Sequence, residues 1–185
     1  MIITRQEALN ILLDNGVIAY PTESVFGIGS KVDSNEAILK ILDLKKRDKN
    51  KGMIIISSNF KFLEKYIDIA SLTKDALDLL NSKQERPTTW VVPASDVVLK
   101  NLIGSHNKKI AVRICDMDII KYLCEGIKGP LISTSANISG YNALKNSLEV
   151  DKCFGDSLKV VDEFTLGVLR PSKIVDLLTM KVLRD

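Results

Sequence analysis

Four groups of polar side chains have the residue types needed to bind a charged small molecule. Two of them, residues 22–24 and 133–139, are runs of small polar side chains close to glycines. The other two are cationic: residues 45–51, with five cations and one acid, and Arg113. Hydroxyls and amides beside clustered Lys and Arg side chains suit an anionic ligand such as a nucleotide polyphosphate.

Each group also has a purely structural explanation. A Lys-rich run after a helix is often only a solvated face, and a serine-rich run after a strand is often a plain turn. Arg113 is less easily explained, because a buried guanidinium needs an anionic or carbonyl partner. The sequence has no GxxxxGK[ST] motif, and the run from Gly27 to Gly29 lacks the third glycine of a dinucleotide fingerprint. A nucleotide site here would therefore be of a different type.

The cysteines and the single histidine lack the spacing of a metal or nucleophile site. Cys115, Cys124 and Cys153 are widely separated, and His106 lies in the polar run GSHNKK. A structural zinc site usually takes four Cys or His ligands, which these residues could supply only in an unusual arrangement. We expect buried, reduced thiols, no metal held by protein side chains, and no Cys–His or Ser–His–Asp nucleophile.

The composition is that of an ordinary globular protein. The 185 residues suit one domain with a full core, and 45% of them are hydrophobic and 26% charged. No apolar run approaches the ~20 residues of a membrane helix. The N-terminus lacks the cationic start and small-residue cleavage site of a signal peptide. We expect a cytoplasmic protein that does not enter a membrane.

The first polar group follows an expected strand. Residues 17–20 are apolar, and Pro21, which lacks an N–H, should end the strand. Residues 22–24 then lie where open α/β sheets bind ligands, beyond a strand's carboxyl end. Gly27 and Gly29 follow, where the backbone needs freedom or close approach. The alternative is a polar turn between two buried segments.

The rest of the chain alternates helices with strands. Residues 4–7 (TRQE) have the form of a capping box for a helix that ends at Gly16. Further helix caps are expected at Asp33 or Ser34, Asn59, Thr73 and Asp116, and a last short helix at 147–154. Further strands are expected at 53–56, 88–94, 109–114, 131–134, 158–161, 173–177 and 181–183. This pattern predicts an α/β or α+β fold, one mixed sheet with flanking helices.

Together these motifs resemble the YrdC-like threonylcarbamoyl-AMP synthases. The matching stretches, in the family's order, are PTESVFGIG at 21–29, LKKRDKNKGMIII at 44–56, TTWVVPA at 88–94, AVR at 111–113, PLISTSANISG at 130–140 and PSKIVD at 171–176. The resemblance spans nearly the whole chain, and its KxR and STSANxSG stretches are specific. It implies one YrdC-like domain over residues 1–185, with a twisted, mixed sheet around a large, positively charged concavity.

The resemblance implies a nucleotidyltransferase that makes L-threonylcarbamoyl-AMP and pyrophosphate from L-threonine, bicarbonate or CO2, and ATP. Downstream tRNA threonylcarbamoyl-transfer proteins would use the product for the N6-threonylcarbamoyladenosine (t6A37) modification of tRNA. Threonine's amine would capture CO2, and the carbamate oxygen would attack the α-phosphorus of ATP. Mg2+, Lys and Arg would neutralise the charge that develops, so no protein nucleophile or base is assigned.

The same resemblance assigns binding residues by position. Those near the threonine are Ser24, Arg113, Ser133 and Ser172. Those near the ATP are Lys45, Arg47, Lys51, Ser135, Asn137 and Arg184. An arginine at position 113 would hold the threonine carboxylate through two parallel hydrogen bonds, which lysine could not reproduce.

Some positions depart from the family pattern. Lys51 stands where longer relatives often have asparagine, Ile56 where they can have histidine, and Lys109 where a small hydroxyl residue is common. Residues 84–87 (QERP) lack the glycine that is frequent before the proline. These departures bear on the phosphate contacts more than on the reaction.

Two other functions fit the same residues. The concavity could hold RNA, which leaves a weak direct contact with tRNA open, although the few aromatics (5%) offer little base stacking. Comparing salt-dependent tRNA affinity with ATP affinity separates this from an adenylate-forming enzyme. The chain could also be a related carbamoyl-transfer domain for another acceptor, but those domains usually sit in longer chains with zinc-like motifs.

Overall fold

The chain folds around one strongly mixed β-sheet. The computed structural model describes residues 1–105 and 108–185. The sheet has ten strands in the order β1-β8-β2-β3-β7-β4-β6-β5-β9-β10. The strands are β1 Ile2–Ile3, β2 Ile18–Pro21, β3 Phe26–Gly29, β4 Ile54–Ser57, β5 Thr88–Pro93, β6 Lys109–Ile114, β7 Leu131–Ser135, β8 Lys159–Val161, β9 Lys173–Asp176 and β10 Val182–Arg184. The prediction of a mixed sheet with flanking helices is confirmed.

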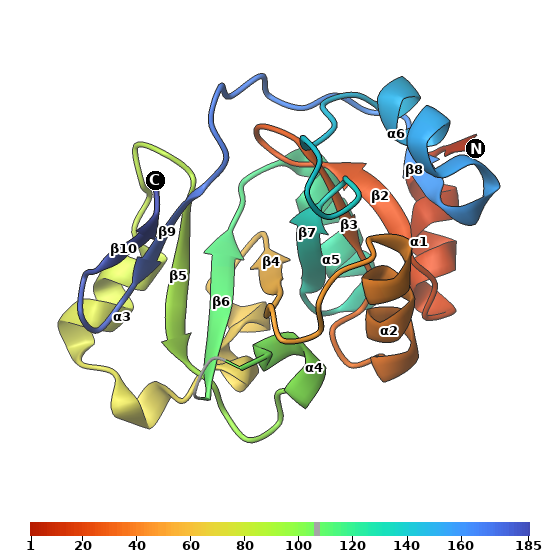
Figure 1. The fold of residues 1–185 in the computed structure, drawn as a ribbon. Helices are drawn as coiled ribbons and strands as arrows, with labels where there is room; N and C mark the ends of the chain where they lie inside the picture. The colour runs from red at the N-terminus through yellow and green to blue at the C-terminus, as the bar shows by residue number, and fades with distance from the viewer. Residues whose placement is uncertain (106–107) are drawn as a thin grey trace.

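The sheet contains both parallel and antiparallel pairs of strands. β8 lies between β1 and β2 and is parallel to both, and the pairs β4/β6 and β5/β9 are also parallel. The remaining pairs, β2/β3, β3/β7, β4/β7, β5/β6 and β9/β10, are antiparallel. Figure 1 shows β8 and the N-terminus on one side of the molecule and β9, β10 and the C-terminus on the other.

Helices flank this sheet, and most of them begin where the sequence predicts. They are α1 Arg5–Leu13, α2 Asn35–Leu44, α3 Lys74–Asn81, α4 Lys100–Ile103, α5 Asp118–Ile127 and α6 Ser147–Phe154. The capping box of α1 is present, with Thr4 and Glu7 bonded reciprocally. Ser34, rather than Asp33, caps α2. Asp116 does not cap α5, whose N-cap is Met117, without a side-chain hydrogen bond.

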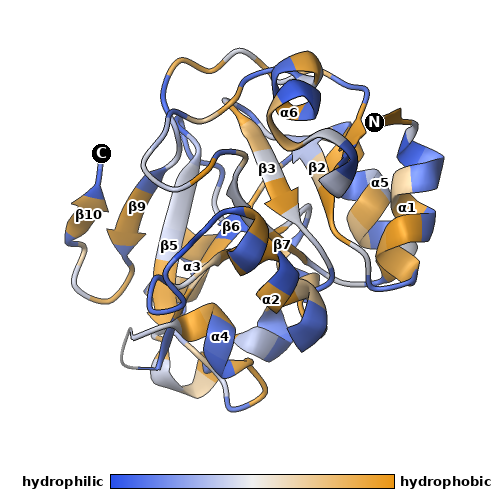
Figure 2. Ribbon diagram, turned by 45° about the vertical axis from the view of Figure 1, so that its right-hand side comes forward, coloured by the Kyte–Doolittle hydropathy of each residue, from blue (hydrophilic) through white to orange (hydrophobic). Residues whose placement is uncertain are grey.

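Two hydrophobic clusters make up the core. One, centred on the buried residues Ile18, Ile56 and Leu123, includes inward faces of α1 and α5. The other is larger and holds the inward side chains of α2, such as Ile38, with those of the central strands, such as Val112. In Figure 2 the strands β3, β7 and β9 are mostly hydrophobic, whereas α2 and α4 show both colours. The helices therefore bury one face and expose the other, as amphipathic helices do.

The strand ends at Pro21, as predicted: Pro21 is the last residue of β2 and pairs with Phe26. Other local expectations are corrected. The segment around Gly27 is a strand, β3, that was not anticipated, although the close backbone approach expected at its glycines is present where Gly29 meets β7. Strand β1 and helix α4 were not anticipated. The helix expected after Asn59 is a pair of 3-10 turns, Phe60–Phe62 and Glu64–Tyr66.

The cysteine prediction is partly wrong. Cys115 and Cys124 are buried free thiols, but Cys153 is exposed on α6. His106, the one histidine, lies outside the described residues. Within residues 1–105 and 108–185, no helix is both long and apolar enough to cross a bilayer.

Gly29 is where the sheet tolerates no side chain. A Cβ on Gly29 would lie 1.8 Å from the carbonyl oxygen of Ile132 on β7. Relief requires the β3 and β7 backbones to separate, so Gly29→Ala is expected to destabilise the fold by about 3 kcal/mol or more, the upper end of overpacking costs. Denaturant unfolding measures this. The matched control is Gly129→Ala, where the nearest atom is 4.0 Å away; equal stability of the two variants would contradict the close approach.

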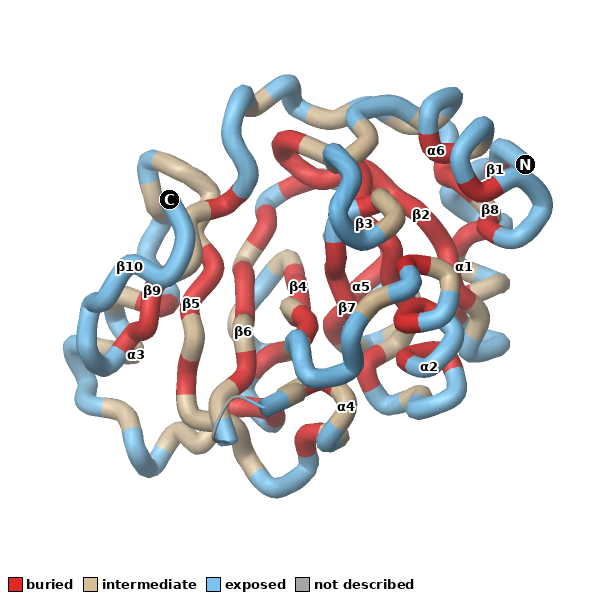
Figure 3. Tube along the Cα trace, in the orientation of Figure 1, coloured by how far each residue is buried: buried red, intermediate tan, exposed pale blue. Residues whose placement is uncertain are grey.

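One long irregular segment, residues 162–172, connects β8 to β9. In Figure 1 this segment crosses over the top of the molecule and so joins the two sides of the sheet. Most of it is exposed, in contrast to the buried central strands, as the colours of Figure 3 show. The N–H of Val168 donates to the carbonyl oxygen of Glu23 at 3.0 Å, which ties this crossing segment to the loop between β2 and β3.

Candidate functional site

A cavity of about 640 Å³ lies against the middle of the sheet. Five of its lining residues are cations: Arg47, Lys51, Lys109, Arg113 and Arg184. Among its described lining residues, Asp176 is the one carboxylate. Hydroxyl side chains from three segments complete its polar wall: Thr22, Ser24, Ser133, Thr134, Ser135 and Ser172. The size is within the range of small-molecule and cofactor sites.

The two-residue period of the strands selects which side chains face the cavity. On β6, Lys109, Ala111 and Arg113 line it, whereas Ile110 and Val112 are buried in the larger core cluster. On β9, Ile174 and Asp176 line it in the same way. Because β6 and β9 flank β5, the cavity runs across three adjacent strands.

Arg113 has an acidic neighbour but is not fully paired. Its side chain is 7% exposed, and Nη2 lies 3.6 Å from Oε2 of Glu23. That separation is longer than a charge-assisted hydrogen bond. Both Nε of Arg113 and Oε2 of Glu23 are buried without a hydrogen-bond partner among the described residues. A buried guanidinium in this condition has donors available for a ligand.

Arg184 lies beside Ser172. Its Nη2 donates to the carbonyl oxygen of Ser172 at 2.7 Å, and Oγ of Ser172 is 2.9 Å from Oγ1 of the buried Thr89. Burial and the neighbouring Arg113 and Arg86 lower the pKa of the Arg184 guanidinium. Like charges held together in a partly buried site are relieved by a bound anion. Arg184 and Arg113 therefore favour an anionic ligand between them.

The C-terminus of α2 places Arg47 at the cavity wall. Lys46 has a positive φ of 50°, and the N–H of Arg47 donates to the carbonyl oxygen of Leu42 at 2.9 Å. These are the features of a Schellman-type helix end. The turned chain brings Arg47 to the cavity wall, where Nη2 donates to the carbonyl oxygen of Gly52 at 2.8 Å and Nε is buried without a partner among the described residues.

Lys45 lies behind the cavity wall. It is 1% exposed and is not among the lining residues. Its ammonium donates to the carbonyl oxygens of Ser135 and Asn137, and to Oδ1 of Asn137 at 3.0 Å. Oδ1 of Asn137 also accepts from Oγ of Ser135 at 2.6 Å. Lys45 and Asn137 thus brace the turn that presents Ser135 to the cavity.

Burial and the neighbouring Arg47 lower the pKa of the Lys45 ammonium to about 7. The folded state then binds fewer protons than the unfolded state between pH 7 and the ordinary lysine pKa, so this group's contribution to stability rises with pH across that window. Lys45→Met is expected to cost about 1–3 kcal/mol near pH 8, since it leaves buried carbonyls without a donor. The deficit relative to the wild type should grow as the pH rises from 7 towards 10 in denaturant titrations. Lys49→Met, in the same segment but exposed, is the control.

Of the ten residues assigned by resemblance, eight line the cavity and two do not. Those that line it are Ser24, Arg47, Lys51, Arg113, Ser133, Ser135, Ser172 and Arg184. Those that do not are Lys45 and Asn137. Sequence reasoning connected Lys109 with the phosphate contacts but did not anticipate Asp176 at the cavity or its ion pair with Lys109, whose Nζ is 2.5 Å from Oδ2. The strand period around Arg113 is the signal that could have placed Lys109 at the cavity.

The described residues do not form a metal site of their own. Within residues 1–105 and 108–185, no group of three or more His, Cys, Asp or Glu side chains is placed to hold an ion. Asp176 is already engaged by Lys109 and by the N–H groups of Leu178 and Thr179.

A family model named Sua5_yciO_yrdC, with the description "Telomere recombination", matches residues 10–185. Among curated proteins, the chain is 39% identical over 181 residues to the threonylcarbamoyl-AMP synthase of Haemophilus influenzae (strain 86-028NP). That similarity covers 98% of this chain and 98% of the relative.

Solved structures agree with the fold. P. abyssi Sua5, solved in complex with L-threonine, matches with a TM-score of 0.87 and 25% identity. The match covers 95% of this chain but 54% of that one, so this chain spans about half the length of P. abyssi Sua5. E. coli YciO matches with a TM-score of 0.83 over 98% of this chain and 88% of that one. Because the identity is 20%, this match supports the fold alone.

Proposed function

The chain belongs to the Sua5/YciO/YrdC family, and we propose that it acts as a threonylcarbamoyl-AMP synthase. The reaction joins L-threonine, bicarbonate or CO2, and ATP into L-threonylcarbamoyl-AMP with release of pyrophosphate. The observation that carries this function is the 39% identity to a curated synthase over 98% of both chains. The cavity supports it, because threonine, carbonate and ATP are all anionic or zwitterionic and the lining cations outnumber the one lining carboxylate.

We infer that the threonine binds at the end of the cavity formed by Arg113 and its neighbours. The free donors of Arg113 suit the threonine carboxylate, which can take two parallel hydrogen bonds from a guanidinium. Ser24, Ser133 and Ser172 offer hydroxyls around the same end. A carboxylate there also offsets the mutual repulsion of Arg113 and Arg184.

We infer that the ATP phosphates bind along the opposite wall. Arg47 and Lys51 supply charge there, Ser135 supplies a hydroxyl, and Arg184 reaches the nucleotide from the other side. Lys45 and Asn137 act through the turn that they brace and not by direct contact. The ATP role proposed for Lys45 is thus a positioning role.

These contacts carry out the reaction by orientation and charge. Arg113 holds threonine with its amine towards the cavity. The ammonium first loses a proton to solvent, and the neutral amine then adds to CO2 and releases a second proton to solvent, which leaves a carbamate. The carbamate oxygen then attacks the α-phosphorus, and Arg47 and Lys51 stabilise the charge that develops on the departing pyrophosphate. None of these steps requires a protein nucleophile.

ATP brings a divalent cation, and Mg2+ is the one we propose. Bound to the phosphates, it neutralises charge at the leaving group. We assign no protein side chain as its ligand, since Asp176 is already paired with Lys109.

We further propose a single YrdC-like domain working in the cytoplasm, where ATP and tRNA are both found. Its product passes to tRNA threonylcarbamoyl-transfer proteins for the t6A37 modification. Any direct contact with tRNA is weak, because the lining cations are directed into a cavity suited to a small molecule.

Pyrophosphate release tests the function. Purified protein is incubated with ATP and Mg2+, with and without threonine and bicarbonate, and the products are analysed by mass spectrometry. Release that needs both co-substrates, with a threonylcarbamoyl-AMP mass, is the expected result. ATP binding without release would contradict the proposed reaction.

A further inference from the structure

Glu23 is a buried carboxylate that the roles above leave unused. It is 8% exposed and is not itself a lining residue: it lies in the cavity wall between Thr22 and Ser24, which both line the cavity. Its backbone is held on two sides: Thr22 closes a turn to Val25 through its N–H at 3.0 Å, and the carbonyl oxygen of Glu23 accepts from Val168. These bonds fix the main chain from which the Glu23 side chain projects.

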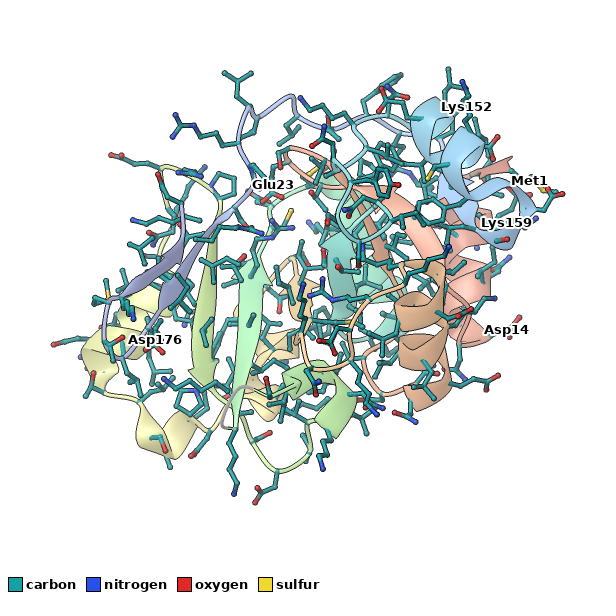
Figure 4. The ribbon with its side chains drawn as sticks, in the orientation of Figure 1. Met1, Asp14, Glu23, Lys152, Lys159 and Asp176 are labelled. Carbon is teal, nitrogen blue, oxygen red and sulfur yellow. The ribbon has the colours of Figure 1, made fainter. Side chains whose placement is uncertain are left out.

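The Glu23 carboxylate lies close to Arg113. Oε2 of Glu23 lies 3.6 Å from Nη2 of Arg113, and in Figure 4 Glu23 lies at the end of β6 that carries Arg113, far from Asp176 at β9. The thiol of Cys115 is its other close neighbour, since burial and then the Glu23 carboxylate raise the pKa of Cys115. The neighbours thus comprise one cation and one neutral thiol.

The geometry of this pair is unusual for a resting ion pair. Two buried opposite charges normally close to hydrogen-bond distance, because each pays a desolvation cost that only close contact offsets. Here Oε2 of Glu23 and Nε of Arg113 both stay without a hydrogen-bond partner among the described residues. Each therefore keeps capacity for a third group.

We infer that Glu23 binds the amine nitrogen of the amino-acid substrate while Arg113 binds its carboxylate. An α-amino acid carries an ammonium and a carboxylate one carbon apart, so adjacent sites of opposite charge match it. Carbamate formation leaves one N–H on that nitrogen, and the Glu23 carboxylate continues to accept a hydrogen bond from it. This inference rests on the proposed function, and it makes Glu23 the residue that selects amino acids over hydroxy acids.

Threonine and two analogues that each lack one of its charged groups test the assignment. The affinity of the protein for each is measured by calorimetry. L-Threonine has both charges, 3-hydroxybutanoate lacks the amine, and threoninol lacks the carboxylate. The wild type is expected to bind threonine at least about tenfold more tightly than 3-hydroxybutanoate, the scale of a charged hydrogen bond. Glu23→Gln should weaken the binding of threonine and of threoninol by about tenfold or more. The same variant should bind 3-hydroxybutanoate as tightly as the wild type or more tightly. Glu125→Gln, the same change on the exposed side of α5, is the control.

The outcomes separate the possibilities. If Glu23→Gln weakens all three ligands alike, Glu23 only supports Arg113 and the inference is wrong. If that variant does not fold, the wild-type series still decides, because equal affinity for threonine and 3-hydroxybutanoate contradicts an amine site. Wild-type protein that forms the adenylate but shows no such preference refutes this inference alone. Wild-type protein that neither binds threonine nor needs it for pyrophosphate release refutes the proposed function as well.

Discussion

Arg113→Ala is expected to abolish productive use of threonine while ATP binding persists. The change removes the guanidinium from a site that is 7% exposed, so the substrate carboxylate would face Glu23 without a cation between them. Truncating one partner of a buried, hydrogen-bonded charge pair costs on the order of 2–5 kcal/mol, or roughly 30-fold to several thousand-fold in affinity. Threonine titrations of pyrophosphate release should show a correspondingly higher KM.

Two controls sharpen that experiment. Arg113→Lys keeps the charge but loses the planar pair of donors, so it should fall between the wild type and alanine. Arg5→Ala, on α1 in an exposed pair with Glu163, should behave like the wild type. Equal losses of threonine and ATP affinity in Arg113→Ala would contradict the assignment of Arg113 to the amino-acid end of the cavity.

Arg47→Ala is expected to weaken ATP binding by about 1.5–3 kcal/mol, the scale of one hydrogen bond to a charged group, or roughly 10- to 150-fold. The guanidinium reaches the cavity wall from the end of α2, and its partial burial lowers the pKa of Arg47. Fluorescence or calorimetric titration with a non-hydrolysable ATP analogue measures the change.

The control for this variant lies two residues away. Lys49→Ala removes an exposed cation from the same segment and should change ATP affinity little, because solvent screens such charges. The two variants together separate a specific contact from a general loss of positive charge. Unchanged ATP affinity in Arg47→Ala would remove that residue from the nucleotide site.

Much of the fold could be predicted from local pattern. The capping box at Thr4, the cap at Thr73 and the exact span of β6 follow from short-range signals that tertiary packing did not override. Strand β3 could not be predicted in this way. Gly27 and Gly29 carry no hydrophobic signal, and the close approach of the β7 backbone to Gly29 depends on a segment about 100 residues further along the chain.

The site, like the fold, could be predicted only in part. Resemblance supplied candidate positions, and the structure brings eight of them to one cavity. It could not distinguish a side chain that faces the cavity from one that supports its wall, as with Lys45, because both lie in one short cationic run. The proximity of Glu23 to Arg113 was equally hidden, since 90 residues of sequence separate them.

The place of β8 in the sheet has a consequence for how the protein folds. β8 lies between β1 and β2, so Ile2 pairs with Val160 and Ala19 with the same residue. A ribosome-bound chain therefore holds two unpaired parallel edges until β8 has been synthesised, and folding cannot proceed segment by segment from the N-terminus. Such non-local pairing slows folding and leaves edges open to aggregation. We expect the nascent chain to depend on chaperones, and the cavity to form in one late, cooperative step.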